Sequence, residues 1–118
     1  MKAMAAKIAA EGESLETSYY LWAQVFQEAS DPQIRQNAES HMRLLKAEMD
    51  CRALNRLGDE FVNKTGRRAT NLMELVREGL LQGVPMDPEG YPYVLDQSGR
   101  ADVNPRSPIF KERLAQKK

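Results

Sequence analysis

Apolar residues recur at helical spacing from the start of the chain. Met1, Met4, Ala5 and Ile8 predict a short first helix, and Gly12 stands where a left-handed C-terminal cap would fall. This segment is therefore expected to be a helix that ends in a glycine turn.

A second helix is predicted to begin at Ser14, whose side-chain oxygen can cap the first turn. Two apolar stripes run along it. The first stripe contains Leu15, Tyr19, Trp22, Ala23 and Phe26, and the second contains Leu21, Val25 and Ala29. A helix that faces solvent on one side needs only one apolar stripe. We therefore expect this helix to be packed between two neighbours.

Asp31 and Pro32 predict that the chain stops and restarts as a third helix. Asp31 can act as the N-cap, and Pro32 fits the first helical position because its missing N–H costs nothing there. The next helix-breaking residue is Gly58 or Gly66, so this helix is expected to be long. Gly58 is expected to mark a bend or a close helix contact. Its apolar face changes midway, from Ile34, Ala38, Met42, Leu45 and Met49 to Leu44, Ala47, Cys51, Leu54, Phe61 and Val62. Its two halves are therefore expected to pack against different elements.

Shorter elements follow Gly66. Asn71 and Glu74 have the spacing of a capping-box start, which predicts a short helix that ends at Gly79. Residues 87–90 predict a β-turn, and the alternation over residues 91–95 is typical of an edge strand because it contains a proline. Residues 96–99 can turn the chain back into a second strand over residues 100–103, and Ser107-Pro108 can start a last helix that ends near Lys117 and Lys118.

These elements predict a mainly α protein. We expect a helical hairpin and a long connecting helix, followed by a small C-terminal α/β cap made of a short helix and a β-hairpin. The expected division is a helical region over residues 1–66 and a cap over residues 67–118. A chain of 118 residues can form one domain or a short piece of a longer array.

Composition narrows the function classes. Seventeen basic and seventeen acidic residues cancel, so no net charge would draw the chain to nucleic acid or to anionic lipid. The chain has no apolar run near the roughly 20 residues that span a bilayer. A soluble protein without membrane insertion is therefore expected, in a compartment that the sequence leaves unknown. A single cysteine excludes an internal disulfide, and a single histidine excludes a histidine-rich metal site.

His41 and Cys51 are the obvious candidates for a base and a nucleophile. They stand ten residues apart on one predicted helix, about 15 Å along its axis, so they cannot form a catalytic dyad. Cys51 is expected to be a small core residue, and His41 a boundary residue, with a pH-sensing role as the alternative. No catalytic residue is predicted.

Two charged clusters are candidates for ligand binding. The carboxylates Asp87, Glu89, Asp96 and Asp102 lie in the turn-rich region, but their spacing does not match a calcium-binding EF-hand loop. Backbone hydrogen bonding within turns explains Asp87 and Asp96, and calcium stays the alternative. The basic residues Lys64, Arg67 and Arg68 are interpreted as a solvated helix end rather than a phosphate site. No cofactor or metal is predicted.

Aromatic and apolar residues of the second helix are the candidates for binding a protein. Tyr19, Trp22 and Phe26 are expected in the core, as are Tyr91 and Tyr93 of the cap. Tyr20 lies off the core stripe, and together with Leu21 and Val25 it is the predicted partner-binding surface. It would serve a protein partner or self-association.

The first third of the chain resembles one degenerate tetratricopeptide unit. The resemblance rests on Ala9-Ala10-Glu11-Gly12, on Tyr19-Tyr20-Leu21-Trp22 and on Ala29-Ser30-Asp31-Pro32. These give small residues on a first helix, a glycine turn, an aromatic second helix and a closing Asp-Pro. The resemblance implies a helical scaffold that binds other proteins.

The C-terminal half resembles the globular part of bacterial type II secretion pseudopilins. The residues that carry the resemblance are Phe61, Thr65-Gly66-Arg67, Leu72, Glu74-Leu75-Val76, Gly79-Leu80-Leu81 and residues 85–93. It implies a long helix, a short helix, an Asp-Pro-x-Gly turn and a tyrosine-containing strand. The apolar helix by which pseudopilins polymerise has no counterpart in this sequence, so filament assembly is not implied. The same cassette resembles the C-terminal end of some bacterial tetratricopeptide proteins.

The sequence therefore favours a non-enzymatic protein-interaction or scaffold module, expected to be the C-terminal part of a bacterial tetratricopeptide-like protein. The alternative is a structural component of a secretion or pilus system related to pseudopilins. An enzyme that uses Asp87 and Glu89 as acid and base is a more distant third hypothesis.

Overall fold

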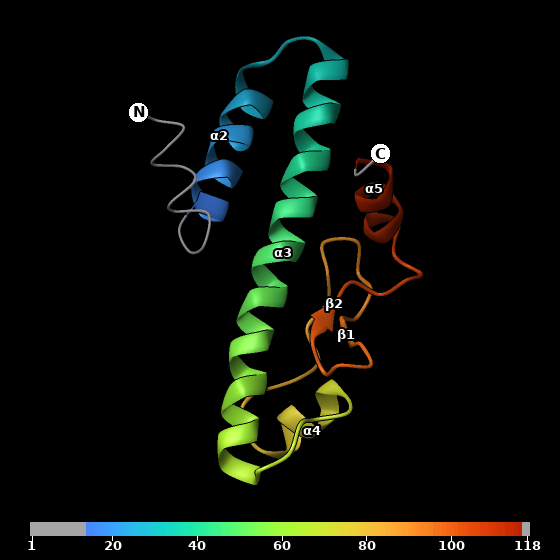
Figure 1. Ribbon diagram of the computed structural model, residues 1–118. Helices are drawn as coiled ribbons and strands as arrows, with labels where there is room; N and C mark the ends of the chain where they lie inside the picture. The colour runs from blue at the N-terminus through green and yellow to red at the C-terminus, as the bar shows by residue number, and fades with distance from the viewer. Residues whose placement is uncertain (1–13, 117–118) are drawn as a thin grey trace. The chain divides into compact units, whose positions relative to one another are not determined.

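A computed structural model describes residues 14–116 and is mainly helical (Figure 1). The elements in chain order are α2 (Ser14–Glu28), α3 (Pro32–Thr65), α4 (Leu72–Arg77), β1 (Val94–Leu95), β2 (Ala101–Asp102) and α5 (Pro108–Gln116). The predicted fold class is confirmed: a long helix, a short helix and a small antiparallel sheet follow one another in the expected order. The first helix expected over residues 1–11, with its glycine cap, and the two terminal lysines lie outside the described residues.

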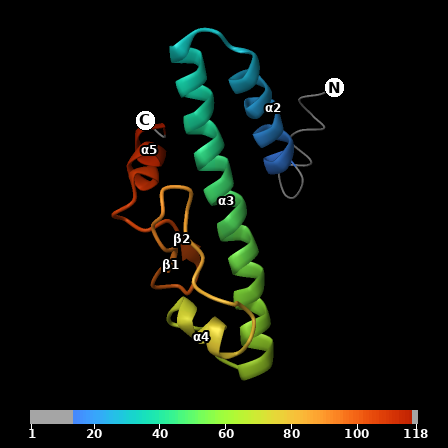
Figure 2. The ribbon, with the colours of Figure 1, turned by 180° about the vertical axis from the view of Figure 1, so that it is seen from behind.

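The chain forms two compact units, Met1–Met49 and Asp50–Lys118, and α3 contributes to both. In the first unit, α2 lies antiparallel beside the first half of α3, as Figures 1 and 2 both show. The predicted N-cap of α3 is confirmed, because Asp31 Oδ1 accepts a hydrogen bond of 2.8 Å from the backbone N–H of Gln33. Pro32 is the first residue of the helix, as expected.

Contacts between α2 and α3 are made by flat rings and by small residues. The Trp22 indole stacks on the His41 imidazole with ring centroids 4.2 Å apart and an interplanar angle of 8°. The Arg35 guanidinium lies 4.5 Å from the centre of the Phe26 ring. The described apolar residues of this unit that are buried are two alanines, Ala38 and Ala47. The hairpin therefore closes without a large buried side chain among its described residues.

The second unit has a core of large side chains. The fully buried apolar residues are Phe61, Leu75, Val103 and Ile109, from α3, α4, the segment after β2 and α5. Cys51 and Leu54 are buried on the same rotated stripe of α3 as Phe61. The prediction that this stripe faces a core is therefore confirmed.

Glycines mark the helix ends in this unit but not a contact within α3. Gly66 follows the last residue of α3 with a φ of +80°, a left-handed conformation that favours glycine. At Gly58 a Cβ atom would meet nothing within 4 Å. The expected close helix contact at Gly58 is therefore wrong, and this glycine lies within an uninterrupted helix.

Helix α4 is defined by its caps. The Asn71 side chain accepts a hydrogen bond of 3.2 Å from the Glu74 N–H, as the capping pattern predicts. The Glu74 carboxylate reaches one residue further back than in the usual capping box, to the N–H of Thr70 at 2.8 Å and its hydroxyl at 2.6 Å. At the other end Gly79 has a φ of +79° and donates to the Val76 carbonyl, while Leu80 donates to that of Leu75. This pair of bonds is a Schellman cap.

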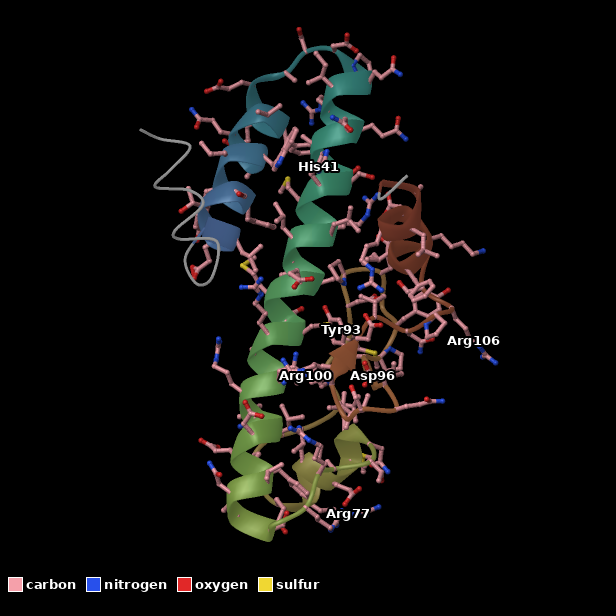
Figure 3. All side chains as sticks on the ribbon, viewed as in Figure 1. His41, Arg77, Tyr93, Asp96, Arg100 and Arg106 are labelled. Carbon is pink, nitrogen blue, oxygen red and sulfur yellow. The ribbon has the colours of Figure 1, made fainter. Side chains whose placement is uncertain are left out.

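The β-hairpin lies beside the second half of α3 in both views (Figures 1 and 2). Val94 pairs with Asp102 and Leu95 with Ala101. Two side chains of α3 fix the hairpin. The Tyr93 hydroxyl donates to Asp50 Oδ2 at 2.6 Å, and the Ala101 N–H donates to Asn55 Oδ1 at 2.8 Å. Figure 3 shows Tyr93 between the hairpin and α3.

One turn geometry occurs twice around this hairpin. Asp87 Oδ1 accepts from the backbone N–H groups of Glu89 and Tyr91, at 2.8 and 3.0 Å. Asp96 Oδ1 accepts in the same way from the residues two and four positions later, at 2.9 and 3.0 Å. The fourth residue of each turn is a glycine with positive φ, +88° at Gly90 and +84° at Gly99. The two predicted turns are therefore confirmed, and each is held by its own aspartate.

Candidate interaction surface

Three large side chains of α2 are exposed to solvent. Relative to full exposure, Tyr20 is 68% accessible, Leu21 59% and Val25 38%. Leu21 and Val25 stand one turn apart on the same line of the helix, and Tyr20 lies about 100° around the axis from Leu21. We call these three residues the α2 patch. They are the residues that the sequence proposes for partner binding.

The exposure of the α2 patch bears on one expectation. The first apolar stripe of α2 is half-buried against α3, including Tyr19, Trp22 and Phe26. Leu21 and Val25 of the second stripe are exposed. Among the described residues, α2 therefore packs on one side, against α3, and the second neighbour stays a prediction.

A shallow groove lies next to Tyr20. It has a volume of about 280 Å³ and is lined by Glu16, Tyr19, Tyr20, Lys46 and Met49. The rings of the two tyrosines meet edge to face, with centroids 6.0 Å apart. The groove therefore combines two aromatic rings with one acidic and one basic side chain.

The surface of this unit carries an excess of negative charge. Between residues 14 and 49 the acidic residues are Glu16, Glu28, Asp31, Glu39 and Glu48, and the basic residues are Arg35, Arg43 and Lys46. Helix α2 itself contains Glu16 and Glu28 and no basic residue. The α2 patch therefore lies on a helix whose only ionised groups are carboxylates.

The residues considered for catalysis do not form a site. His41 stacks on Trp22 in the first unit (Figure 3), whereas Cys51 is buried in the second. They remain ten residues apart on the continuous helix α3. The expectation that Cys51 is a small core residue is confirmed.

The acidic residues of the turns are engaged in the fold. Asp87 and Asp96 hold their own turns, and Asp102 forms an ion pair of 2.9 Å with Arg113 of α5. Within residues 14–116 no three histidine, cysteine, aspartate or glutamate side chains are grouped so that they could hold a metal ion. One atom stands out, because Asp87 Oδ2 is buried without a hydrogen-bond partner among the described residues.

Arg67 of the basic cluster joins α4 to the end of α3. Its guanidinium pairs with the buried carboxylate of Glu74, and it also lies 5.3 Å from the centre of the Phe61 ring. Hydrogen bonds from Arg67 and Thr70 lower the pKa of Glu74 to about 2. Lys64 and Arg68 are exposed at the end of α3. Arg67 therefore has a structural partner, which the sequence-based interpretation of a solvated helix end did not include.

The polar partners that α3 supplies to the β-hairpin were not predicted from the sequence. Tyr93 is buried as expected, and burial together with its hydrogen bond to Asp50 raises the pKa of its hydroxyl well above 10. Asp50 and Asn55 flank buried positions of the rotated stripe of α3. Their position at the border of an apolar stripe was the available signal for these polar residues. The sequence does not indicate their partners, which lie 43 residues from Asp50 and 46 residues from Asn55.

The helices described here include none that is both long and apolar enough to cross a bilayer. Comparisons with protein-family models, with curated proteins and with solved structures found no match. The interpretation of function therefore rests on the residues and the geometry above.

Proposed function

We propose that this chain is a non-enzymatic protein-interaction or scaffold module, the C-terminal part of a bacterial tetratricopeptide-like protein. Its partner binds at the α2 patch, Tyr20, Leu21 and Val25. The observation that carries the proposal is the exposure of these three large side chains on one helix. Single exposed apolar residues are ordinary, but neighbouring ones, here Leu21 and Val25 one turn apart with Tyr20 next to Leu21 in sequence, are typical of interaction sites.

The thin core of the helical hairpin supports the same proposal. Its buried apolar residues, among those described, are Ala38 and Ala47. Burying a leucine side chain stabilises a protein by about 1.5–3 kcal/mol. Contact with another helix over Leu21 would therefore add a stabilising term that the hairpin lacks when it stands alone.

Light scattering coupled to size exclusion tests whether the α2 patch is adhesive. At high protein concentration we expect the average mass to rise above that of the monomer, because an exposed apolar patch drives association. The Leu21→Glu variant should stay monomeric. Met73→Glu is the matched control, since Met73 is 46% exposed on α4 in the other unit. A clean monomer at every concentration, together with the absence of any partner or peptide whose binding depends on Tyr20, Leu21 or Val25, would contradict the proposal.

A structural component of a secretion or pilus system is the second candidate. It is favoured by the order of α4, the Asp87 turn and the strand after Tyr93, which matches the order that the pseudopilin resemblance implies. The coding sequence upstream of Met1 discriminates the two candidates. An apolar pilin-type helix there would favour the second candidate, and further helical repeats would favour the first.

A further inference from the structure

Negative charge borders the exposed line of the α2 patch. Glu28 stands three residues after Val25 and seven after Leu21, so it shares their face of the helix. Its Oε2 atom accepts a hydrogen bond of 3.2 Å from Gln24, and Asp31 is exposed just beyond the end of α2. An occupant of Leu21 and Val25 therefore meets carboxylates at the C-terminal end of α2.

Between residues 14 and 49, the basic side chains are placed elsewhere. Arg35 lies over the Phe26 ring, Arg43 lies 3.7 Å from Glu39, and Lys46 lines the groove beside Glu16. All three belong to α3. None of them belongs to the helix that carries the patch, so its negative charge has no basic neighbour along α2.

The shape of the α2 patch fits a helix. Side chains four residues apart form a ridge, and such a ridge packs into the groove between side chains of another helix. The exposed parts of three side chains are a small share of the roughly 800 Å² per partner that a stable interface between globular proteins buries. A single helical segment therefore matches the patch better than a broad domain surface.

From these observations we infer that the occupant of the α2 patch is an amphipathic helix of a partner protein, with apolar residues one turn apart and lysine or arginine beside them. The inference rests on the proposed function and specifies the chemistry of its partner. A second copy of α2 fits less well, because it would bring together two helices that contain carboxylates and no basic residue.

Two synthetic helical peptides test this inference with the full chain. Both carry leucines one turn apart, and their flanking positions are lysine in one peptide and glutamate in the other. In a fluorescence anisotropy titration the lysine peptide should bind at least about tenfold more tightly, and the preference should shrink in high salt. Leu21→Ser should weaken binding of the lysine peptide at least about tenfold, because it removes the apolar anchor.

A charge-reversal pair separates a local effect from net charge. Glu28→Lys should reduce the preference for the lysine peptide about two- to fivefold, as expected for loss of exposed charge pairing. Glu60→Lys makes the same change of net charge at an exposed residue of α3 in the second unit and should leave the preference unchanged.

The outcomes distinguish the inference from the proposed function. Equal binding of the two peptides, or an equal effect of Glu28→Lys and Glu60→Lys, overturns the basic partner helix. If Leu21→Ser still abolishes peptide binding in either case, the α2 patch remains the contact surface. Failure of both peptides to bind, with mass that rises and depends on Leu21, overturns the inference in favour of a second copy. Peptide binding that Leu21→Ser leaves intact overturns both.

Discussion

At the scale of single residues, Asp87 and Asp96 make the same pair of backbone hydrogen bonds in different surroundings. Asp96 is exposed, whereas Asp87 is buried and leaves Oδ2 without a hydrogen-bond partner among the described residues. A buried polar atom without a partner costs free energy, because it has lost its hydrogen bonds to water. The Asp87 turn therefore combines two good hydrogen bonds at Oδ1 with an unfavourable atom beside them.

Asparagine and alanine at position 87 should separate these two effects. Asp87→Asn keeps an acceptor for the Glu89 and Tyr91 N–H groups and exchanges the unpaired Oδ2 for an unpaired amide NH2 group, so we expect stability within about 1 kcal/mol of wild type. Asp87→Ala leaves both donors without their acceptor and should cost about 1–3 kcal/mol. Urea denaturation measures both variants. An asparagine variant as unstable as the alanine variant would mean that Oδ2 has a favourable role.

At the scale of elements, α4 is a six-residue helix held at both ends by specific bonds. Asn71 caps its start, Gly79 closes its end, and Arg67 binds the Glu74 carboxylate. A helix this short is not stable in isolation. Its position therefore depends on these caps, on the burial of Leu72 and Leu75, and on the ionised state of Glu74.

Acid should weaken the anchoring of α4. The pKa of Glu74 is about 2 in the folded protein and 4.5 when unperturbed, so the unfolded chain binds the proton more readily. The stability contributed by ionised Glu74 is present in full above pH 4.5 and is lost as the pH falls towards 2. Unfolding measured from pH 7 to pH 2 should show a smaller acid-dependent loss in Glu74→Gln than in wild type.

Glu78→Gln serves as the control for this titration. Glu78 is the exposed C-cap residue of the same helix and forms no ion pair among those found in the described structure. Its replacement should leave the acid-dependent loss as in wild type. Equal curves for wild type and Glu74→Gln would show that the pairing with Arg67 does not stabilise the fold.

Local signals explain why the elements could be predicted from sequence. The caps at Asp31 and Asn71 and the two aspartate turns join a side chain to the backbone within four residues. The glycine cap after α4 joins backbone groups that are no more than five residues apart. Contacts between distant segments carried no such signal. The hydrogen bond between Tyr93 and Asp50 depends on how the β-hairpin packs against α3. The spacing of residues along the chain does not indicate this packing. The candidate site was named by its residues, but their exposure could not be derived, because an apolar stripe alone does not indicate whether it is covered.

At the scale of the whole molecule, the two compact units differ in how they are held together. The described residues of the first unit bury two alanines, while the second buries Phe61, Leu75 and further large side chains. Local opening is easiest where few apolar side chains are buried. Each unit is therefore expected to have its own resistance to local opening.

Hydrogen exchange should reveal this difference directly. Backbone amides in the middle of α2 are expected to exchange at least about tenfold faster than those around Leu54 and Phe61 of α3, because the latter lie over the large core. Mass spectrometry with peptide-level resolution is sufficient for the comparison. Addition of the lysine-flanked peptide should slow exchange in α2 and leave the region around Phe61 unchanged. Equal protection in both regions without peptide would show that the helical hairpin of α2 and α3 is stabilised by more than its described contacts.

The two aspartate turns, at Asp87 and Asp96, also affect how quickly this part of the chain folds. Each aspartate needs only the next four residues to complete its bonds, so the loop that must close is among the shortest a chain can form. Loops of this length close on a timescale far below that of global folding. The two bends can therefore form and dissolve many times while the chain is still searching for its other contacts. The pairing of Val94 with Asp102 then starts from ends that one bend already holds close together.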